Sequence, residues 1–162
     1  MLLSLFSPMV HADMQLASYV TEDVIEPAST PTHSPTQPII AVESPYDYDT
    51  TLQNVKKAIA GRNFRLIRVQ ELTDGFSASE KGTRDTVVYF CNFDLVNQAI
   101  RIDTRIGQFL PCRITVHEKD GKVYLMALNP VPISELLGEE KLKKICLQVT
   151  SMYRGLLEDA IL

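Results

Sequence analysis

The segment of residues 112–128 constrains the fold more than any other part of the sequence, because it predicts a β-hairpin. In CRITVHE (112–118) apolar and polar residues alternate, as they do in a strand with one buried face. Asp120-Gly121 follows, a pair that suits a tight hairpin turn because such a turn needs positive φ. The apolar run KVYLMAL (122–128) is then expected to return as the neighbouring strand.

Two further strands and three helices are predicted around this hairpin. FRLIRVQ (64–70) is strand-like, and TVVYFC (86–91) is continuously apolar, as in a strand covered on both faces. Apolar residues at helical spacing predict helices over residues 50–60, from Asp94 to Ile100, and over residues 134–162. This order predicts an α+β fold: a single antiparallel or mixed sheet of about four strands with helices packed on it.

The N-terminal third predicts processing and a linker rather than a folded unit. MLLSLFSPMV (1–10) is apolar and uncharged, and Val10-His11-Ala12 places short residues before a possible cleavage site, so residues 1–12 resemble the remnant of a secretory signal peptide. Residues 13–43 are rich in Pro, Ser and Thr and predict an extended linker. A single α/β domain is then expected over residues 44–162.

The signal-peptide interpretation places the protein in the periplasm or otherwise outside the cytoplasm. The alternative is an ordinary N-terminus that is apolar by chance, and this alternative makes the protein cytoplasmic.

Composition excludes some classes of partner. The chain has 162 residues, of which 45% are hydrophobic, and this suits one domain with tails. Its net charge of −4 argues against a nucleic-acid partner, because such binders are usually basic. No apolar run approaches the roughly 20 residues that span a bilayer, so no transmembrane segment is expected.

Cys91 and Cys112 are the candidates for redox chemistry or a disulfide. They lie at the ends of two predicted strands, on either side of the link that carries the short helix. Three interpretations stay open: a structural disulfide, a redox-active or sulfur-carrying thiol pair, and two unrelated buried thiols. The third cysteine, Cys146, lies in the apolar stripe of the last helix and is expected in the core.

Arg101, Arg105 and Arg113 are the candidates for binding an anion. They crowd the same link and the following strand, where guanidinium groups could hold a carboxylate or another oxyanion. The alternative is that they are surface arginines paired with Asp94 and Asp103.

No pattern in the sequence predicts a metal, a cofactor or a catalytic residue. The chain lacks C-x-x-C, H-E-x-x-H, a P-loop, G-x-G-x-x-G and a serine nucleophile elbow. Asp47 and Asp49 could form a pair of cation ligands, but we favour Asp49 as a helix cap and Asp47 as a solvated side chain.

Several motifs, taken in order, resemble the bacterial family known as domain of unknown function 302. SPYDYDTTL (44–52) is similar to the motif that leads into the first helix of that family. VVYFCN (87–92) resembles its strand that ends in a small residue and Asn, and LPCRITV (110–116) followed by DGKV (120–123) resembles its Leu-Pro strand and hairpin. The resemblance covers about residues 44–130 and, more loosely, the C-terminal helix.

The resemblance implies a compact α/β domain that often self-associates, and it implies no activity. Cys91 stands where a glycine is common in the family, and Cys112 follows the Leu-Pro pair, so any role of these cysteines would belong to a subgroup.

Our leading interpretation is therefore an exported, non-catalytic module that binds a small ligand, a partner protein or a second copy of itself. The alternatives are a periplasmic redox or sulfur-handling protein that uses Cys91 and Cys112, and an unrecognised enzyme.

Overall fold

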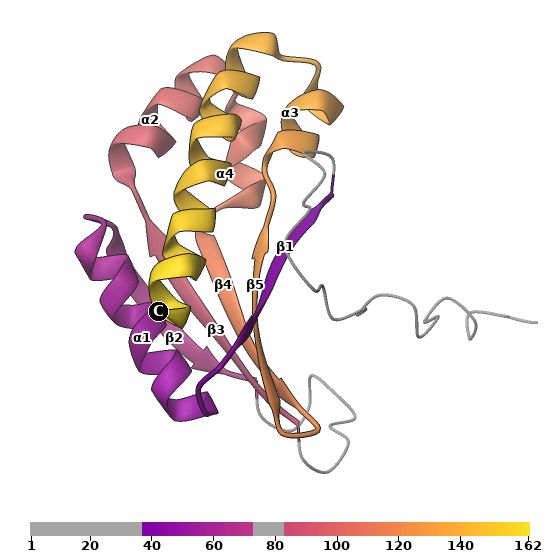
Figure 1. Cartoon of the computed structure of the whole chain (residues 1–162). Coiled ribbons are helices and arrows are strands. Elements are labelled where there is room, and N and C mark those ends of the chain that lie inside the picture. Colours follow the sequence, from indigo (N-terminus) through magenta and orange to yellow (C-terminus); the bar gives the residue numbers. More distant parts are fainter. Residues whose placement is uncertain (1–36, 73–82) are drawn as a thin grey trace, which may run out of the picture.

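The structure, a computed structural model, describes residues 37–72 and 83–162 and combines one sheet with helices (Figure 1). In chain order the elements are β1 (Ile39–Ser44), α1 (Tyr48–Gly61), β2 (Arg65–Glu71), β3 (Arg84–Cys91), α2 (Phe93–Ile102), the 3-10 helix η2 (Thr104–Phe109), β4 (Cys112–Lys119), β5 (Lys122–Leu128), α3 (Val131–Leu137) and α4 (Glu140–Ile161). The predicted signal peptide and most of the predicted linker lie outside the described residues.

The sheet is antiparallel, with the strand order β1-β5-β4-β3-β2. The α+β fold class is confirmed, although the sheet has five strands where about four were expected. The predicted hairpin is also confirmed: β4 and β5 pair, and Asp120 and Gly121 at the turn have φ values of 53° and 76°. Strands β3 and β4 are also direct neighbours, joined by the 20-residue link that contains α2 and η2.

The fifth strand, β1, includes residues that the sequence analysis assigned to the linker. Residues 39–43 belong to β1, which pairs with β5 at the edge of the sheet, so the linker was predicted to extend too far. The physical reason is local: Pro38 directly precedes an apolar run, and the buried side chain of Ile40 joins the core. Because the preceding residues are rich in proline, the sequence analysis predicted a linker where the chain forms a short edge strand.

The C-terminal region forms two helices where one was predicted over residues 134–162. Gly138 has a φ of 71° and ends α3, and its backbone N–H donates to the carbonyls of Ser134 and Glu135. Glycine is the residue that adopts this left-handed conformation without steric cost, and it commonly ends helices. The chain then starts α4 at Glu140 in a new direction.

One face of the sheet carries the main core. Helices α1 and α4 lie side by side across this face (Figure 1). Phe90 of β3 is fully buried there, with its ring centroid 5.2 Å from that of Phe64 and 5.7 Å from that of Tyr153 on α4. A second cluster of buried side chains lies beside α2, α3 and the start of α4, and includes Ala99 and Ile106.

The opposite face of the sheet carries no helix of the described part of the chain (Figure 1). It presents a row of side chains across three strands, in which Tyr89 of β3 is paired with Arg68 of β2 and Arg113 of β4. The guanidinium carbon of Arg68 lies 5.4 Å from the centroid of the Tyr89 ring.

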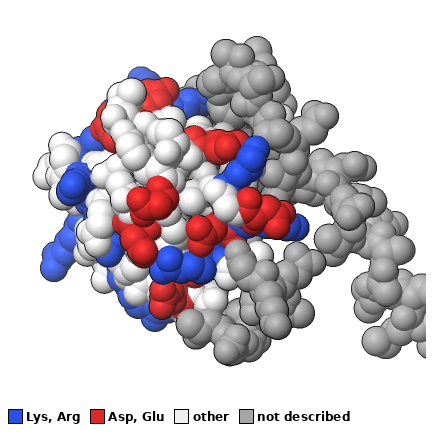
Figure 2. All heavy atoms as spheres, turned by 60° about the horizontal axis from the view of Figure 1, so that its bottom comes forward, with Lys and Arg blue, Asp and Glu red and all other residues white. Residues whose placement is uncertain are grey.

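Charges of both signs are mixed on the face that Figure 2 shows. Among the exposed ion pairs of the fold, Arg84 lies 3.1 Å from a carboxylate oxygen of Asp49 and 3.9 Å from one of Glu71. Such exposed pairs stabilise a fold only slightly, by about 0–1 kcal/mol each. None of the helices in the described ranges has the length and apolar character that crossing a membrane would require.

Candidate functional site

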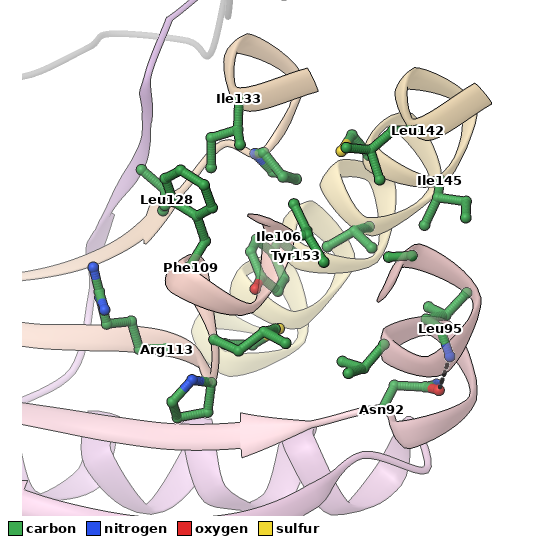
Figure 3. Close-up of a pocket in the computed structure, with 18 of the residues that line it drawn as sticks. Asn92, Leu95, Ile106, Phe109, Arg113, Leu128, Ile133, Leu142, Ile145 and Tyr153 are labelled. Atoms are coloured by element: carbon green, nitrogen blue, oxygen red, sulfur yellow. Dashed lines mark hydrogen bonds between the residues drawn. The ribbon is translucent and has the colours of Figure 1, made fainter. Parts of the chain in front are cut away.

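An apolar cavity of about 80 Å³ lies at the end of the sheet where β3 stops and β4 begins (Figure 3). Its lining comes from α2, η2, the start of β4, the end of β5, α3 and α4. The side chains labelled in Figure 3 are Asn92, Leu95, Ile106, Phe109, Arg113, Leu128, Ile133, Leu142, Ile145 and Tyr153.

The link between β3 and β4 builds one wall of the cavity because both of its helices are capped and amphipathic. Asn92 ends β3 and caps α2, with its Oδ1 accepting from the Leu95 backbone N–H at 3.1 Å. The buried face of α2 presents Leu95 and Ala99 to the cavity. Asp103 caps η2 in the same way, so that Ile106 turns inward.

Asn129 fixes the opposite wall. Its side chain is almost fully buried and joins four parts of the chain. Its Oδ1 accepts from the Val131 backbone N–H at 3.1 Å and from the Thr150 hydroxyl at 2.9 Å, and its Nδ2 donates to the Gln37 carbonyl at 2.7 Å. Residues before β1, at the start of α3 and along α4 are thereby held together at the end of β5.

The lining is predominantly apolar, with few polar groups. These include Cys112, Cys146, the Tyr153 hydroxyl and, as the one charged side chain in the lining, Arg113. A concave, largely apolar site with few polar groups is typical of sites that bind small molecules.

The two candidate cysteines, Cys91 and Cys112, lie on opposite faces of the sheet. Phe90 is paired with Cys112, and both of these side chains face α4, where they meet Tyr153. Successive strand residues point to opposite faces, so Cys91 points away from them. All three cysteines are free thiols in the structure, and Cys112 and Cys146 both line the cavity, whereas Cys91 does not.

Burial raises the pKa of all three thiols. For Cys91 the neighbouring Cys112 raises the pKa further. For Cys112 and Cys146, hydrogen bonds with the hydroxyls of Tyr153 and Ser134 offset part of the rise. Burial also raises the pKa of Tyr153 well above its ordinary value, and Cys112 adds to this effect. The lining of the cavity is therefore uncharged at neutral pH except at Arg113.

We expect the protein to lose stability as the pH rises through the ordinary thiol pKa of 9.0. Above that value the unfolded chain releases thiol protons that the native state still holds, so the thiol contribution to the free energy of unfolding falls with rising pH and is constant below that value. Urea unfolding between neutral pH and about pH 10 measures this dependence. Cys112→Ala should remove part of the slope, and an unchanged slope in this variant would contradict the burial of that thiol.

The three candidate arginines have different environments. Arg105 is bound to Asp103, with an Nη2 to Oδ2 distance of 2.6 Å, and donates to the Leu137 carbonyl at 3.0 Å, so it links η2 to the end of α3. Arg101 is exposed on α2 and does not line the cavity. Arg113 is exposed at the edge of the cavity, beside Phe109 and Leu128 in Figure 3.

Asp47 and Asp49 have structural partners. Asp47 is the cap of α1, since its Oδ1 accepts from the Thr50 backbone N–H at 2.9 Å, and the prediction that Asp49 is the cap is wrong. Asp49 pairs with Arg84 instead. Within residues 37–72 and 83–162, no three His, Cys, Asp or Glu side chains form a group that could hold a metal ion.

Sequence reasoning missed two features of the structure. The first is the cavity. Ile106 and Phe109 could have indicated it, because they are apolar residues in a segment that was interpreted only as a break between strands. The second is a pair across β3 and β4, in which the Nδ1 of His117 lies 2.7 Å from the Oδ1 of Asp85. The spacing of this pair depends on strand register, which a single sequence does not fix.

Comparisons with known proteins agree with this architecture. The structure is similar to the crystal structure of an uncharacterised conserved DUF302 protein from Bacillus stearothermophilus, with a TM-score of 0.69 and 16% identity over 75% of this chain and 97% of that one. No curated protein matches the chain significantly. The model of the domain of unknown function DUF302 matches residues 40–160, about three quarters of the sequence, and the chain therefore belongs to the DUF302 family.

Proposed function

We propose that this protein is a non-catalytic binding module that takes a small apolar group into the cavity at the end of its sheet. The observation that carries the proposal is the cavity itself: an apolar space walled by the link between β3 and β4 on one side and by α3 and α4 on the other. Close-packed interiors contain few voids larger than a water molecule, and apolar cavities stay dry and can take up apolar ligands.

The volume limits the size of the group that fits. A cavity of about 150 Å³ lined by apolar side chains holds benzene. The cavity here, at about 80 Å³, is about half that size. It suits a short or branched alkyl group without rearrangement of its walls.

The state of the thiols favours binding over thiol chemistry. Nucleophilic attack and redox exchange require the thiolate. Burial raises the pKa of Cys112 and Cys146, and this disfavours the thiolate at neutral pH. In the proposed role the two thiols form part of a soft, polarisable wall.

Export is a separate part of the proposal, and it rests on the sequence of residues 1–12 alone. Protein recovered from the periplasm after expression of the full chain should then begin at Asp13, which mass spectrometry of the intact protein would measure.

We expect Ala99→Leu to abolish the uptake of a small apolar probe. Ala99 is buried on α2 and lines the cavity, so a larger side chain at this position would occupy the space. Xenon is a suitable probe because it enters dry apolar cavities without a polar contact. Amide NMR spectra under xenon pressure should show shifts confined to the cavity residues of the wild type and no such shifts in the variant.

Ala60→Leu is the matched control, because it makes the same alanine-to-leucine substitution at an exposed position of α1. This variant should take up xenon like the wild type. The proposal fails if xenon leaves the cavity residues of the wild type unshifted, or if it shifts them equally in Ala99→Leu.

A further inference from the structure

We propose that the ligand is a short amphipathic carboxylate, whose alkyl group fills the cavity and whose anionic head pairs with Arg113. This inference rests on the proposed binding function and names the chemical class of the ligand. Three observations support it: the place of Arg113, its lack of a carboxylate partner, and a second arginine nearby.

Arg113 lies where the apolar cavity meets solvent. It is the second residue of β4, and the register that pairs Ile114 with Ala127 puts it beside Leu128 of β5. Both residues line the cavity, and both lie at its edge in Figure 3, near Phe109. A ligand with its alkyl group among the apolar side chains can therefore place its head against the guanidinium group.

Within the described residues, some arginines bind a carboxylate of the protein and others, among them Arg113, do not. Arg62, Arg84 and Arg105 each bind a carboxylate of the protein. Arg113 has neither an ion pair nor a side-chain hydrogen bond with any residue in the described ranges. Its guanidinium group can thus offer a fork of donors to a carboxylate, which matches that geometry.

A second positive charge lies on the same face. Arg68 and Arg113 are both paired across the sheet with Tyr89, one from each side, and Arg68 stacks on the Tyr89 ring. Neither arginine has an acidic partner within the described part of the chain. Two such charges attract an anion to this edge although the chain as a whole has a net charge of −4.

A single carboxylate suits this edge better than a phosphate ester. Arg113 is the one charged side chain in the lining, and Arg68 does not line the cavity, so one guanidinium group at the cavity balances one negative charge. The remaining polar groups of the lining are weak or neutral donors such as the Cys112 thiol and the Tyr153 hydroxyl. The volume of about 80 Å³ restricts the alkyl part to a few carbons.

The test compares isovalerate with isoamyl alcohol, which have the same branched alkyl group and differ in the charge of the head. We expect the wild-type protein to bind isovalerate about five- to tenfold more tightly at neutral pH, as measured by the amide shifts of cavity residues during titration. Arg113→Gln should abolish this preference and leave the binding of the alcohol unchanged. Arg113→Lys should keep part of the preference, because the positive charge remains.

Arg101→Gln is the matched control, since Arg101 is an exposed arginine on α2 that does not line the cavity. This variant should keep the full preference for isovalerate. The inference is overturned if the alcohol binds as tightly as the acid, or if Arg101→Gln lowers the preference as much as Arg113→Gln does. The xenon experiment distinguishes failure of this inference from failure of the proposed binding function. If the protein takes up xenon but does not prefer the acid, only the carboxylate inference is overturned. If it takes up no xenon, the binding function is overturned as well.

Discussion

Phe90→Ala is expected to lower the free energy of unfolding by about 3–5 kcal/mol, the range for removing a large aromatic side chain from a core. Phe90 has no exposed surface, and its ring meets Phe64 and Tyr153 edge to face. Truncation removes the burial of the ring and leaves a hole between the sheet and α4. Urea unfolding followed by circular dichroism would measure the change from the shift in midpoint at constant slope.

Phe93→Ala provides the matched control, three residues further along the chain. The Phe93 side chain is 51% exposed at the start of α2, with the Arg65 guanidinium carbon 5.9 Å from its ring centroid. Loss of an exposed contact of this kind should lower the free energy of unfolding by less than about 1 kcal/mol. Equal losses from the two variants would show that the core does not lie where the structure puts it.

The second large effect is expected for Asn129→Ala, which should lower the free energy of unfolding by about 2–4 kcal/mol. The loss has a different cause, because the substitution removes little apolar area. It leaves the buried Val131 N–H without its acceptor, removes one of the two acceptors of the Thr150 hydroxyl, and removes the donor to the Gln37 carbonyl. Because Asn129 holds α3 at the cavity wall, amide hydrogen exchange of α3 should rise along with the loss of stability.

A double-mutant cycle with Thr150→Val checks the origin of this effect. The Thr150 hydroxyl lies 2.9 Å from Asn129 Oδ1 and also contacts the Cys146 carbonyl at 2.9 Å. The two substitutions share one hydrogen bond, so the double variant should lose less stability than the sum of the single variants. Strictly additive losses would mean that the two side chains do not interact.

The strands and their turn could be predicted because their signals are local. The alternation in residues 112–118 and the Asp120-Gly121 pair determine the hairpin almost alone, and the apolar run of residues 86–91 marks the central strand β3. Family resemblance and pattern agree here. The helix ends were harder to predict, since Asp47 and Asp49 are equally good caps by composition and only the path of the chain decides between them.

The missed elements depend on contacts between distant residues. Strand β1 becomes a strand because β5 offers it a free edge, and this information lies about 80 residues further along the chain. The cavity is a gap left by packing among six elements, so no short segment encodes it. The arginines illustrate the same limit: Arg101, Arg105 and Arg113 look equivalent in sequence, and the fold pairs Arg105 with Asp103 while it places Arg113 at the cavity edge.

The link between β3 and β4 has a consequence for how such a domain can diversify. The two strands that it joins are hydrogen-bonded directly to each other, so their pairing does not require any particular link. The link nevertheless supplies Leu95, Ala99, Ile106 and Phe109 to the cavity. Under the proposed function, exchanging residues 92–111 for a different sequence would therefore change which ligand fits the cavity, while β3 and β4 keep their register.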